Sequence, residues 1–272
     1  AQIIAGPYAA MLLADQGADV VKMEPPGGES YRTVYTSPKL APFGKGFLVL
    51  NRNKRSIMVD LTIKDGRDVL QRLARWADVF ISNLQPHRAE RFGATYEVLS
   101  EANPNLIFAS ISAFGEFGPD AGRPAYDQVI QARAGIVSAR RMPDGTPVTP
   151  STMTSDITSA MTLAYAIMTA LWERARTGKG RLVDISLLGM ALAVQAPHMV
   201  RIEGDDTPLP GTNLNATASP YQCSDERWLM LVAMTDAQWA GLCQVLEVEH
   251  LGNDPMFQSY DLRSRNTPEL SE

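Results

Sequence analysis

Hydrophobic and polar positions in the first part of the chain follow two periods in turn, one typical of helices and one typical of strands. Residues 7–18 have a helical pattern, in which Pro7 suits a first turn and Gly17 suits the end of a helix. Short β-rich runs and further helical spacings follow it. The expected strands are 19–24, 56–61, 78–83 and 105–115, and the expected helices are 64–77 and two short ones within 87–102.

These strands and helices alternate roughly every 25–35 residues, which is the rhythm of βαβ units in a parallel sheet with helices on both faces. Sheets of this kind bind ligands beyond the carboxyl ends of their strands. We therefore expect an α/β fold, with candidate ligand loops at EPPGG (24–28), SNLQP (82–86) and SAFGEFGP (112–119).

The second half of the chain predicts a long helix from after Thr158 to about Arg176, and then a strand and a helix within 181–194. From Gly204 onward the residues shift to Gly, Pro, Asn and Thr, as in a linker. We expect a large domain at 1–203, a linker at 204–219 and the start of a smaller domain at 220–272.

Within the smaller domain, 227–234 predicts a strand and 235–246 predicts a helix that Thr235 or Asp236 caps. The first residues of the chain continue a structural unit, and the last ones begin a helix. We therefore expect the sequence to be truncated at both ends.

The chain has 272 residues, of which 45% are hydrophobic and 20% charged, as in a soluble globular protein with a substantial core. Its net charge is −5 and its basic residues are interleaved with acidic ones, so we expect no nucleic-acid partner. No apolar run reaches the roughly 18 residues that a membrane span needs. Cys223 and Cys243 are too few for a disulfide framework or a cysteine-rich metal site, so we expect a cytoplasmic protein without a metal.

Two loops allow both a structural and a ligand-binding interpretation, and the three histidines indicate no metal site. The loop PPGGE (25–29) has neither GxGxxG nor GxxxxGK[ST] spacing, so it is either an ordinary turn or a ligand loop of another kind. The basic loop NRNKRS (51–56) is either a solvated turn or a site for a phosphorylated ligand, because Lys and Arg pair with phosphate oxygens. His87, His198 and His250 lack the spacing of a zinc site.

Asp156 stands among small hydroxylated and apolar residues in STMTSDITSAM (151–161), at the start of the long helical pattern. The local sequence allows it to be either a helix N-cap or a nucleophile. Thr154 or Ser155 can cap the helix equally well and leave Asp156 free for another task. The helix dipole favours an ionised carboxylate at this end, which suits a nucleophile.

Six blocks of sequence occur in an order that resembles one known family. Through them the chain resembles, over nearly its whole length, the family III CoA-transferases (CaiB/BaiF), which include formyl-CoA and carnitine CoA-transferases and share their fold with α-methylacyl-CoA racemase. The blocks are AGPYAAMLLADQGADVVKMEPPGG (5–28), NRNKRSIMVDL (51–61), ADVFISNLQPHRAERFG (77–93), PNLIFASISAFGEFGP (104–119), AYDQVIQARAGI (125–136) and TGKGRLVDISLL (177–188).

The resemblance implies a Rossmann-like large domain with a parallel sheet, a smaller α+β domain and an interlocked homodimer. It implies an enzyme that moves CoA from an acyl-CoA to a carboxylic acid through an aspartyl-CoA thioester. The family's nucleophilic Asp precedes the helix that ends at TGKG, and Asp156 holds that position here, which favours Ser155 or Thr154 as the cap. Tyr126 matches an active-site Tyr of the transferases.

The resemblance also implies which residues contact CoA, namely Ile4, Ala5, Glu24, Pro25, Arg52, Lys54, Arg55, Asn83, Leu84 and Arg91.

The chain departs from formyl-CoA transferase at Ile4, where that enzyme has Gln, and at 211–220, where it has a glycine-rich loop. Both departures count against oxalate or formate specificity. Racemases have a His where this chain has Tyr126, whose ordinary pKa of about 10 does not suit acid–base work near neutral pH. A racemase is therefore the alternative prediction, and a non-catalytic CoA-binding homologue, against which the intact Asp156 argues, is the second.

Overall fold

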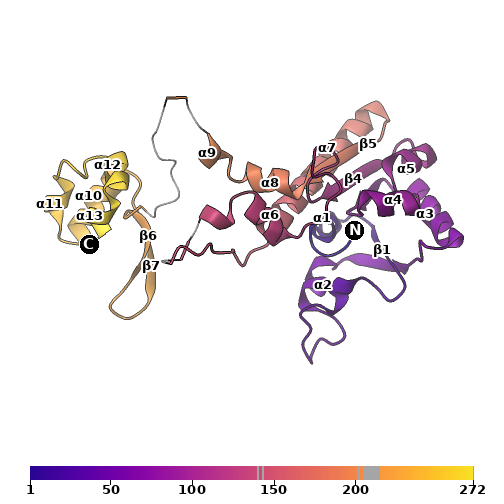
Figure 1. Cartoon of the computed structure of the whole chain (residues 1–272), viewed down its shortest axis with the longest axis horizontal. Helices are drawn as coiled ribbons and strands as arrows, with labels where there is room; N and C mark the ends of the chain where they lie inside the picture. Colours follow the sequence, from indigo (N-terminus) through magenta and orange to yellow (C-terminus); the bar gives the residue numbers. More distant parts are fainter. Residues whose placement is uncertain (140, 143, 201–202, 205–214, 272) are drawn as a thin grey trace. The chain divides into compact units, whose positions relative to one another are not determined.

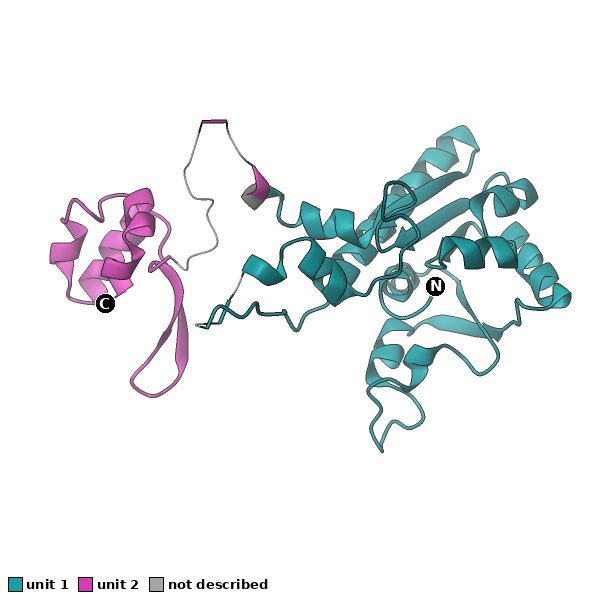
Figure 2. Cartoon of the chain, viewed as in Figure 1, with its two compact units in different colours: residues 1–197 teal, residues 198–272 magenta. Residues whose placement is uncertain are grey.

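The computed structural model describes residues 1–139, 141–142, 144–200, 203–204 and 215–271. The chain divides into two compact units, residues 1–197 and 198–272 (Figure 2). Most of the expected linker, 205–214, lies outside the described residues. Its last residues, 218 and 219, belong to a strand. The domain limits predicted from the sequence stay a prediction.

Unit 1 alternates strands and helices along the chain, as the sequence pattern predicts (Figure 1). Its strands are β1 (Val20–Glu24), β2 (Lys54–Met58), β3 (Val79–Ser82), β4 (Ile107–Ser112) and β5 (Arg181–Ser186). Its helices are α1 (Ala5–Asp15), η1 (Ser30–Thr33), α2 (Lys45–Leu50), α3 (Lys64–Trp76), α4 (Pro86–Phe92), α5 (Tyr96–Ala102), α6 (Asp127–Arg133), η2 (Val137–Ala139), α7 (Thr154–Thr177) and α8 (Leu187–Ala193), with α9 (Ala196–Met199) at the border of the units.

The five strands of unit 1 pair in parallel, which confirms the predicted α/β class, but the described strands form two sheets rather than one. Strands β1 and β2 form the first sheet, and β3, β4 and β5 form the second with β4 in the centre. The first residues contact both sheets. The Nζ of Lys22 in β1 donates to the Ala1 carbonyl at 3.2 Å, and Asn83, just after β3, exchanges two hydrogen bonds with the Gln2 backbone.

Helix α7 carries the main core of unit 1. Its Leu163 and Ile167 are fully buried and recur at helical spacing, so they share one face. They pack in one cluster with Ala9 of α1 and Ile111 of β4, and burying a side chain of this size contributes about 1.5–3 kcal/mol. The packing fixes the N-terminal end of α7 beside α1 and α6.

The start of α7 differs from the prediction. The helix begins at Thr154, and its N-cap is Met153, so the prediction that Thr154 or Ser155 is the cap is wrong. The Ser155 hydroxyl is buried and has no hydrogen-bond partner in the described part of the chain. Instead, Asp127 of α6 accepts the backbone N–H of Asp156 through its Oδ1 at 2.8 Å. An acceptor from another helix thus satisfies one of the donors that a helix start leaves free.

Unit 2 is a β-hairpin followed by short helices. The antiparallel strands are β6 (Ala218–Gln222) and β7 (Trp228–Val232). The predicted helix is α10 (Asp236–Val245), where Thr235 forms a capping box with Gln238. The remaining helices are α11 (Glu249–Gly252), α12 (Tyr260–Arg265) and α13 (Thr267–Ser271). Among the described residues, every helix of the chain is too short or too polar to traverse a bilayer.

Candidate active site

A cavity of about 270 Å³ opens at the N-terminal end of α7, and we call it the Asp156 cavity. It brings together Asp156, Tyr126 and Ile4, three of the residues that the sequence singled out. The loop before α1, the segment around η1 and the start of α6 form its other walls. The full lining is Ile3, Ile4, Ser30, Tyr31, Val34, Tyr35, Tyr126, Asp127, Gln128, Met153 and Asp156.

Asp156 lies in the first turn of α7, and its backbone is held by Asp127. Asp127 is 1% exposed, and its Oδ2 accepts a hydrogen bond from the Gln131 side chain, which also donates to the Thr152 carbonyl at 2.8 Å. Both ends of the segment that leads into α7 are therefore tied to α6. This network fixes the position of Asp156 without occupying its carboxylate.

Burial, and after it the nearby charge of Asp127, together raise the pKa of Asp156 from 3.8 to about 7. The sequence had suggested that the helix dipole would favour the ionised form. In the structure the loss of hydration and the second carboxylate outweigh that dipole. A carboxyl group with a pKa of about 7 is about half ionised at neutral pH and is more basic than an exposed aspartate.

Three tyrosines line the Asp156 cavity, and only Tyr126 was predicted. Tyr126 precedes α6 and is 68% exposed, with its side chain at the mouth of the cavity. Burial raises the pKa of Tyr31, and the charges of Tyr35 and Asp156 add to the rise. The Tyr31 hydroxyl lies over Gly46 of α2, where an added Cβ would come within 2.5 Å of it. Gly46 therefore leaves the space in which the Tyr31 side chain reaches this wall.

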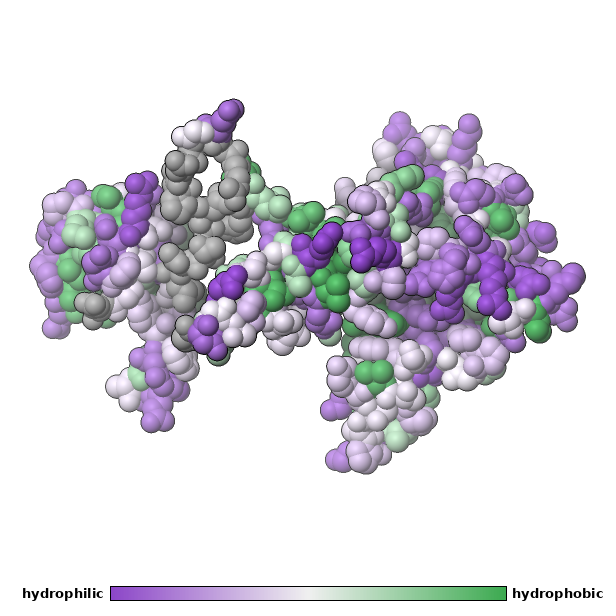
Figure 3. Space-filling model, in the orientation of Figure 1, coloured by the Kyte–Doolittle hydropathy of each residue, from purple (hydrophilic) through white to green (hydrophobic). Residues whose placement is uncertain are grey.

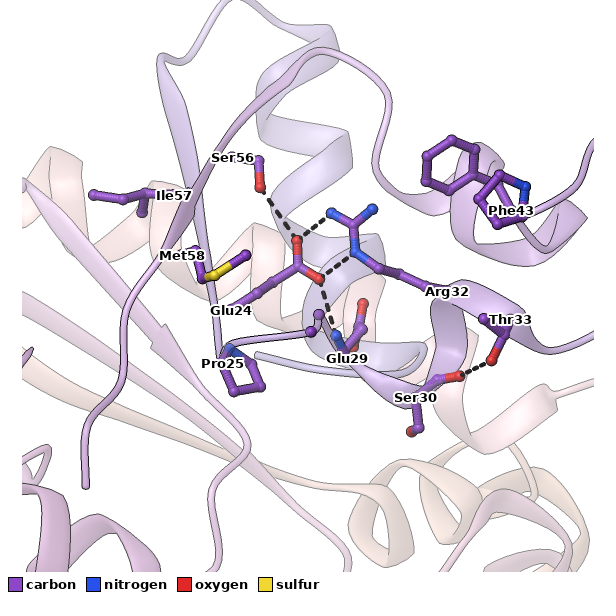
Figure 4. A pocket seen from close by; sticks show the side chains of 13 residues that line it. Glu24, Pro25, Glu29, Ser30, Arg32, Thr33, Phe43, Ser56, Ile57 and Met58 are labelled. Carbon is purple, nitrogen blue, oxygen red and sulfur yellow. Dashed lines mark hydrogen bonds and ion pairs between the residues drawn. The ribbon is translucent and has the colours of Figure 1, made fainter. Parts of the chain in front are cut away.

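A larger cleft of about 540 Å³ adjoins the carboxyl end of β1, and we call it the Glu24 cleft (Figure 4). Predicted residues Glu24 and Pro25 line it, together with Arg32, Phe43 and Met58. Ser30 lines both the cleft and the Asp156 cavity, so η1 contributes to the walls of both spaces.

Glu24 is the central side chain of this cleft (Figure 4). Arg32 binds its carboxylate with two hydrogen bonds of 2.7 and 2.6 Å, and the Glu29 N–H donates to it at 3.1 Å. Burial alone would raise the pKa of Glu24, but these donors hold it below the ordinary value. The Arg32 guanidinium also lies 4.3 Å from the ring centre of the buried Phe47 and 5.7 Å from that of Phe43, and Arg32 and Phe43 both line the cleft.

The basic loop 51–56 is engaged by protein groups. Arg52 forms an ion pair with Asp15, and Arg55 forms one with Asp19. Lys54 donates to the carbonyls of Pro7 and Leu50 at 2.7 and 2.6 Å and to the Asn51 side chain at 2.9 Å. Burial lowers the pKa of Lys54 to about 7. These three hydrogen bonds use all the donors of a lysine ammonium, so Lys54 holds the neighbouring backbone and has no donor left for a ligand.

The remaining predicted contacts lie apart from the linings of the cavity and the cleft. The Asn83 side chain uses both its oxygen and its nitrogen on Gln2, each at 2.8 Å. Leu84 packs against the core around α3 and α5. Arg91 is exposed on α4, beside the ring of Phe92, and Ala5 is buried at the start of α1. Their role in binding CoA stays a prediction.

Sequence reasoning missed Asp127, Tyr31, Arg32 and Glu29. Asp127 stands beside Tyr126 in the AYDQ block. It was missed because an Asp at the start of a short helix suggests a cap for that helix, whereas here it accepts a backbone N–H at the start of another helix, α7. Arg32 follows the glycine loop by only a few residues, which is the signal that could have placed it in the cleft.

This architecture defines an α/β protein with a cleft at the carboxyl end of a parallel strand and a half-buried acid in a neighbouring cavity. The model of CoA-transferase family III matches residues 1–272, and the chain belongs to this family. An acyl-CoA transferase of Fusarium pseudograminearum is 34% identical over 290 residues, covering 99% of this chain and 62% of the relative. The succinate–glutarate CoA-transferase of Agrobacterium fabrum is 32% identical, covering 100% of this chain and 70% of the relative.

Solved structures are similar over the whole chain. A crystal structure of Rv3272 from Mycobacterium tuberculosis matches with a TM-score of 0.88 and 31% identity, and a CaiB/BaiF family protein from Brucella suis with 0.82 and 33%. Each comparison covers 100% of this chain, and 73% and 74% of the respective neighbours. The chain thus spans between 62% and 74% of the length of the relatives described here.

Proposed function

We propose that this protein transfers CoA between carboxylic acids and that Asp156 is its nucleophile. The observation that carries the proposal is the position of Asp156, which lines a cavity that shares the wall residue Ser30 with the Glu24 cleft. A long ligand in the cleft can thus present its reactive end to Asp156. The family membership and the names of the relatives support CoA transfer as the reaction.

In the first half-reaction an Asp156 carboxylate oxygen attacks the thioester carbonyl of the donor acyl-CoA. The carbon–sulfur bond breaks, CoA leaves as a thiolate, and a mixed anhydride joins Asp156 to the acyl group. The thiolate then attacks the Asp156 carbonyl, which releases the donor carboxylate and forms an aspartyl-CoA thioester. Splitting the exchange in this way is covalent catalysis.

In the second half-reaction the acceptor carboxylate attacks the Asp156 carbonyl and displaces the thiolate, which gives a second anhydride. The thiolate then attacks the acceptor's acyl carbon, so the new acyl-CoA leaves and the Asp156 carboxylate is restored. The thioester energy is kept throughout, so the scheme uses neither ATP nor a metal. Backbone N–H groups at the helix starts near Asp156 can stabilise the oxyanions.

We propose that the Glu24 cleft receives CoA. Its size and the Phe43 ring suit a ligand with an aromatic base, and Arg32, which is itself paired with Glu24, is a cation of its lining. Arg52 and Arg55 are exposed cations, but each is already paired with an acidic side chain. That pairing lowers their attraction for the phosphates of CoA, so we propose only a minor role for them. Arg91 is the predicted contact with an exposed guanidinium outside those pairs, among the residues that the structure describes.

The names of the relatives describe exchange between different pairs of carboxylic acids. The relatives are named for succinate and glutarate, for acetate and oxalate, and for succinate and mesaconate. We propose a carboxylic acid acceptor that the Asp156 cavity can hold, with Tyr31, Tyr35 and Tyr126 as hydrogen-bonding walls.

We also propose that the active form is a homodimer in the cytoplasm. Helix α7 exposes a stripe of large apolar side chains along one face, and such surfaces mark protein interfaces. Hydrophobic residues also reach the surface over α6 and α8, including Val129 at 55% exposed (Figure 3). Both cysteines are free thiols, in keeping with a reducing compartment.

The test of this function is trapping of the intermediate. Purified protein mixed with acyl-CoA and hydroxylamine should form a hydroxamate on Asp156 that peptide mass spectrometry detects. Asp156→Ala should lose at least about 10³-fold in exchange rate while it still binds CoA by calorimetry. Near-normal turnover by Asp156→Ala would sink the proposal, and Glu173→Gln on the exposed part of α7 is the control.

A further inference from the structure

The segment that leads into α1 forms one wall of the Asp156 cavity and has an unusual backbone. Ile3 and Ile4 both line the cavity, and Ile3 has φ of +68°. A β-branched residue in this left-handed region is a genuine outlier, and it persists only where the surrounding structure holds it. Such strain gathers at functional sites.

Three side chains hold this segment. Glu29 accepts the Ile3 N–H through its Oε2 at 2.8 Å, and Asn83 holds the Gln2 backbone from both sides. Lys22 donates to the Ala1 carbonyl at 3.2 Å. The Ala1 carbonyl, the N–H and carbonyl of Gln2 and the Ile3 N–H therefore each have a side-chain partner.

Glu29 and Lys22 form the buried centre of this arrangement. Their ion pair is 2.8 Å long, and the two side chains are 0% and 7% exposed. Removing two charges from water is costly, and an apolar pair of similar size often stabilises a fold as well or better. The carboxylate does what an apolar side chain cannot do, because it takes the Ile3 N–H with one oxygen and Lys22 with the other.

Glu29 also connects the wall to the CoA side of the site. Its backbone N–H donates to Glu24, and it lies in the lining of the Glu24 cleft next to Ser30. One residue therefore contributes to the cleft with its backbone and holds the wall of the Asp156 cavity with its side chain.

We infer that Glu29, held by Lys22, is a positioning residue that keeps Ile3 left-handed and so sets the Ile3–Ile4 wall against Asp156 for CoA transfer. The inference rests on the proposed function for its effect on rate. The clamp itself is a property of the fold and is measured separately.

The kinetic test uses Glu29→Gln and Lys22→Met in the full chain. We expect kcat to fall about 10–100-fold and KM for acyl-CoA to change less than about threefold. The reason is that a displaced Ile3–Ile4 wall would misalign the thioester with Asp156, which lowers the rate more than it weakens binding. Glu173→Gln, which breaks the exposed pair with Arg181, is the matched control and should keep kcat within about twofold. A kcat within twofold of wild type for Glu29→Gln would overturn the inference.

Rescue separates positioning from a merely structural role. Glycine adopts the left-handed region without strain, so the fall in kcat that Glu29→Gln causes should be at least about fivefold smaller in the Ile3→Gly background than in wild type, a comparison in which the loss of the Ile3 side chain cancels. A buried pair that only stabilised the core would give no recovery from a change at Ile3, and absence of rescue would contradict the inference.

Amide hydrogen exchange provides a readout that needs no activity. In Glu29→Gln the peptide covering residues 1–8 should exchange at least about tenfold faster than in wild type, while peptides of α3 and α5 stay unchanged. Unchanged exchange in that peptide would reject the clamp. If wild-type protein exchanged no acid pair at all, the proposed function would fail, and this measurement would still decide the clamp.

Glu29→Asp serves if Glu29→Gln does not fold. The shorter carboxylate keeps the charge beside Lys22 but draws back from the Ile3 N–H. The same fall in kcat and the same faster exchange at residues 1–8 are expected, and wild-type values for both would overturn the inference.

Discussion

At the residue scale, the carboxyl group of Asp156 is held where its charge is poorly solvated. Burial and the Asp127 charge raise its pKa to about 7. The folded protein therefore binds the proton more tightly than the unfolded chain does. The stability that comes from the protonated form is fully present below about pH 4 and is lost as the pH rises through about 7.

Asp156→Asn removes the poorly solvated negative charge while keeping the shape of the side chain. We expect the variant to be more stable than wild type by about 1–3 kcal/mol at pH 8 and almost equal to it at pH 4. Urea unfolding at both pH values measures the difference. A variant that is equally stable at pH 8, or less stable, would show that Asp156 is ionised at little cost in the folded protein.

Gly46 sets the position of Tyr31, because a Cβ there would meet the hydroxyl at 2.5 Å. Gly46→Ala should push the Tyr31 side chain toward the Asp156 cavity and lower kcat/KM by about 5–50-fold. Tyr31→Phe in the same background removes the clashing oxygen and should restore part of the loss. Steady-state kinetics of the single and double variants test this, and strictly multiplicative effects would exclude a contact between the two residues.

At the element scale, the start of α7 depends on α6. Asp127→Ala removes the acceptor of the Asp156 N–H and should destabilise the protein by about 1–2 kcal/mol. Asp127→Asn keeps an acceptor but removes the charge. We therefore expect Asp127→Asn to be nearer to wild type in stability than Asp127→Ala is. We also expect the midpoint of its rate–pH profile to lie at a lower pH than in wild type, because one cause of the raised Asp156 pKa is gone.

Thermal unfolding and the rate of exchange between pH 5 and 9 measure the two effects. Wild-type activity should rise with pH through about 7 as Asp156 ionises. An unchanged midpoint in Asp127→Asn would remove Asp127 as a cause of the shift.

The elements that the sequence predicted are those whose signal is local. Pro7, Gly93 and the β-rich runs at 19–24 and 78–83 placed α1, β1, β3 and the break between α4 and α5. The cap of α7 was missed because its acceptor comes from a residue 29 positions away. Helix α2 was missed because KGFLVL is too short to show a helical period.

The candidate site divides in the same way. Residue types and the order of blocks placed Asp156, Tyr126, Ile4, Glu24 and Pro25 on the linings of two adjoining spaces. The basic loop suggested free cations, but Asp15 and Asp19 lie far enough away in sequence that their pairing with Arg52 and Arg55 was invisible. Partners of a charged side chain are set by the fold, and spacing along the chain does not reveal them.

At the scale of the whole molecule, the exposed stripe on α7 predicts association of two copies. Its four side chains recur every three or four residues and are 54–74% exposed, far more apolar surface than one helix face of a monomer usually presents. They are Met161, Tyr165, Met168 and Trp172.

Wild-type protein should therefore have the mass of two chains in light scattering. Tyr165→Glu combined with Met168→Glu should shift it to one chain, because two buried charges of like sign oppose the contact. Val98→Glu, on the exposed side of α5, is the control and should leave the mass unchanged. A monomeric wild type, or a dimer that tolerates both acids, would show that α7 does not form the interface.

The shared wall at Ser30 has a consequence for inhibitors. Because Ser30 belongs to the walls of both the Glu24 cleft and the Asp156 cavity, a single molecule that reaches across η1 can occupy both if it joins a CoA-like arm to a carboxylate mimic. Once the first arm is bound, the second arm is present at an effective concentration that a short linker sets at about the millimolar level. A linked compound of this kind should bind far more tightly than either half, and the length of linker that binds best would measure the path over η1.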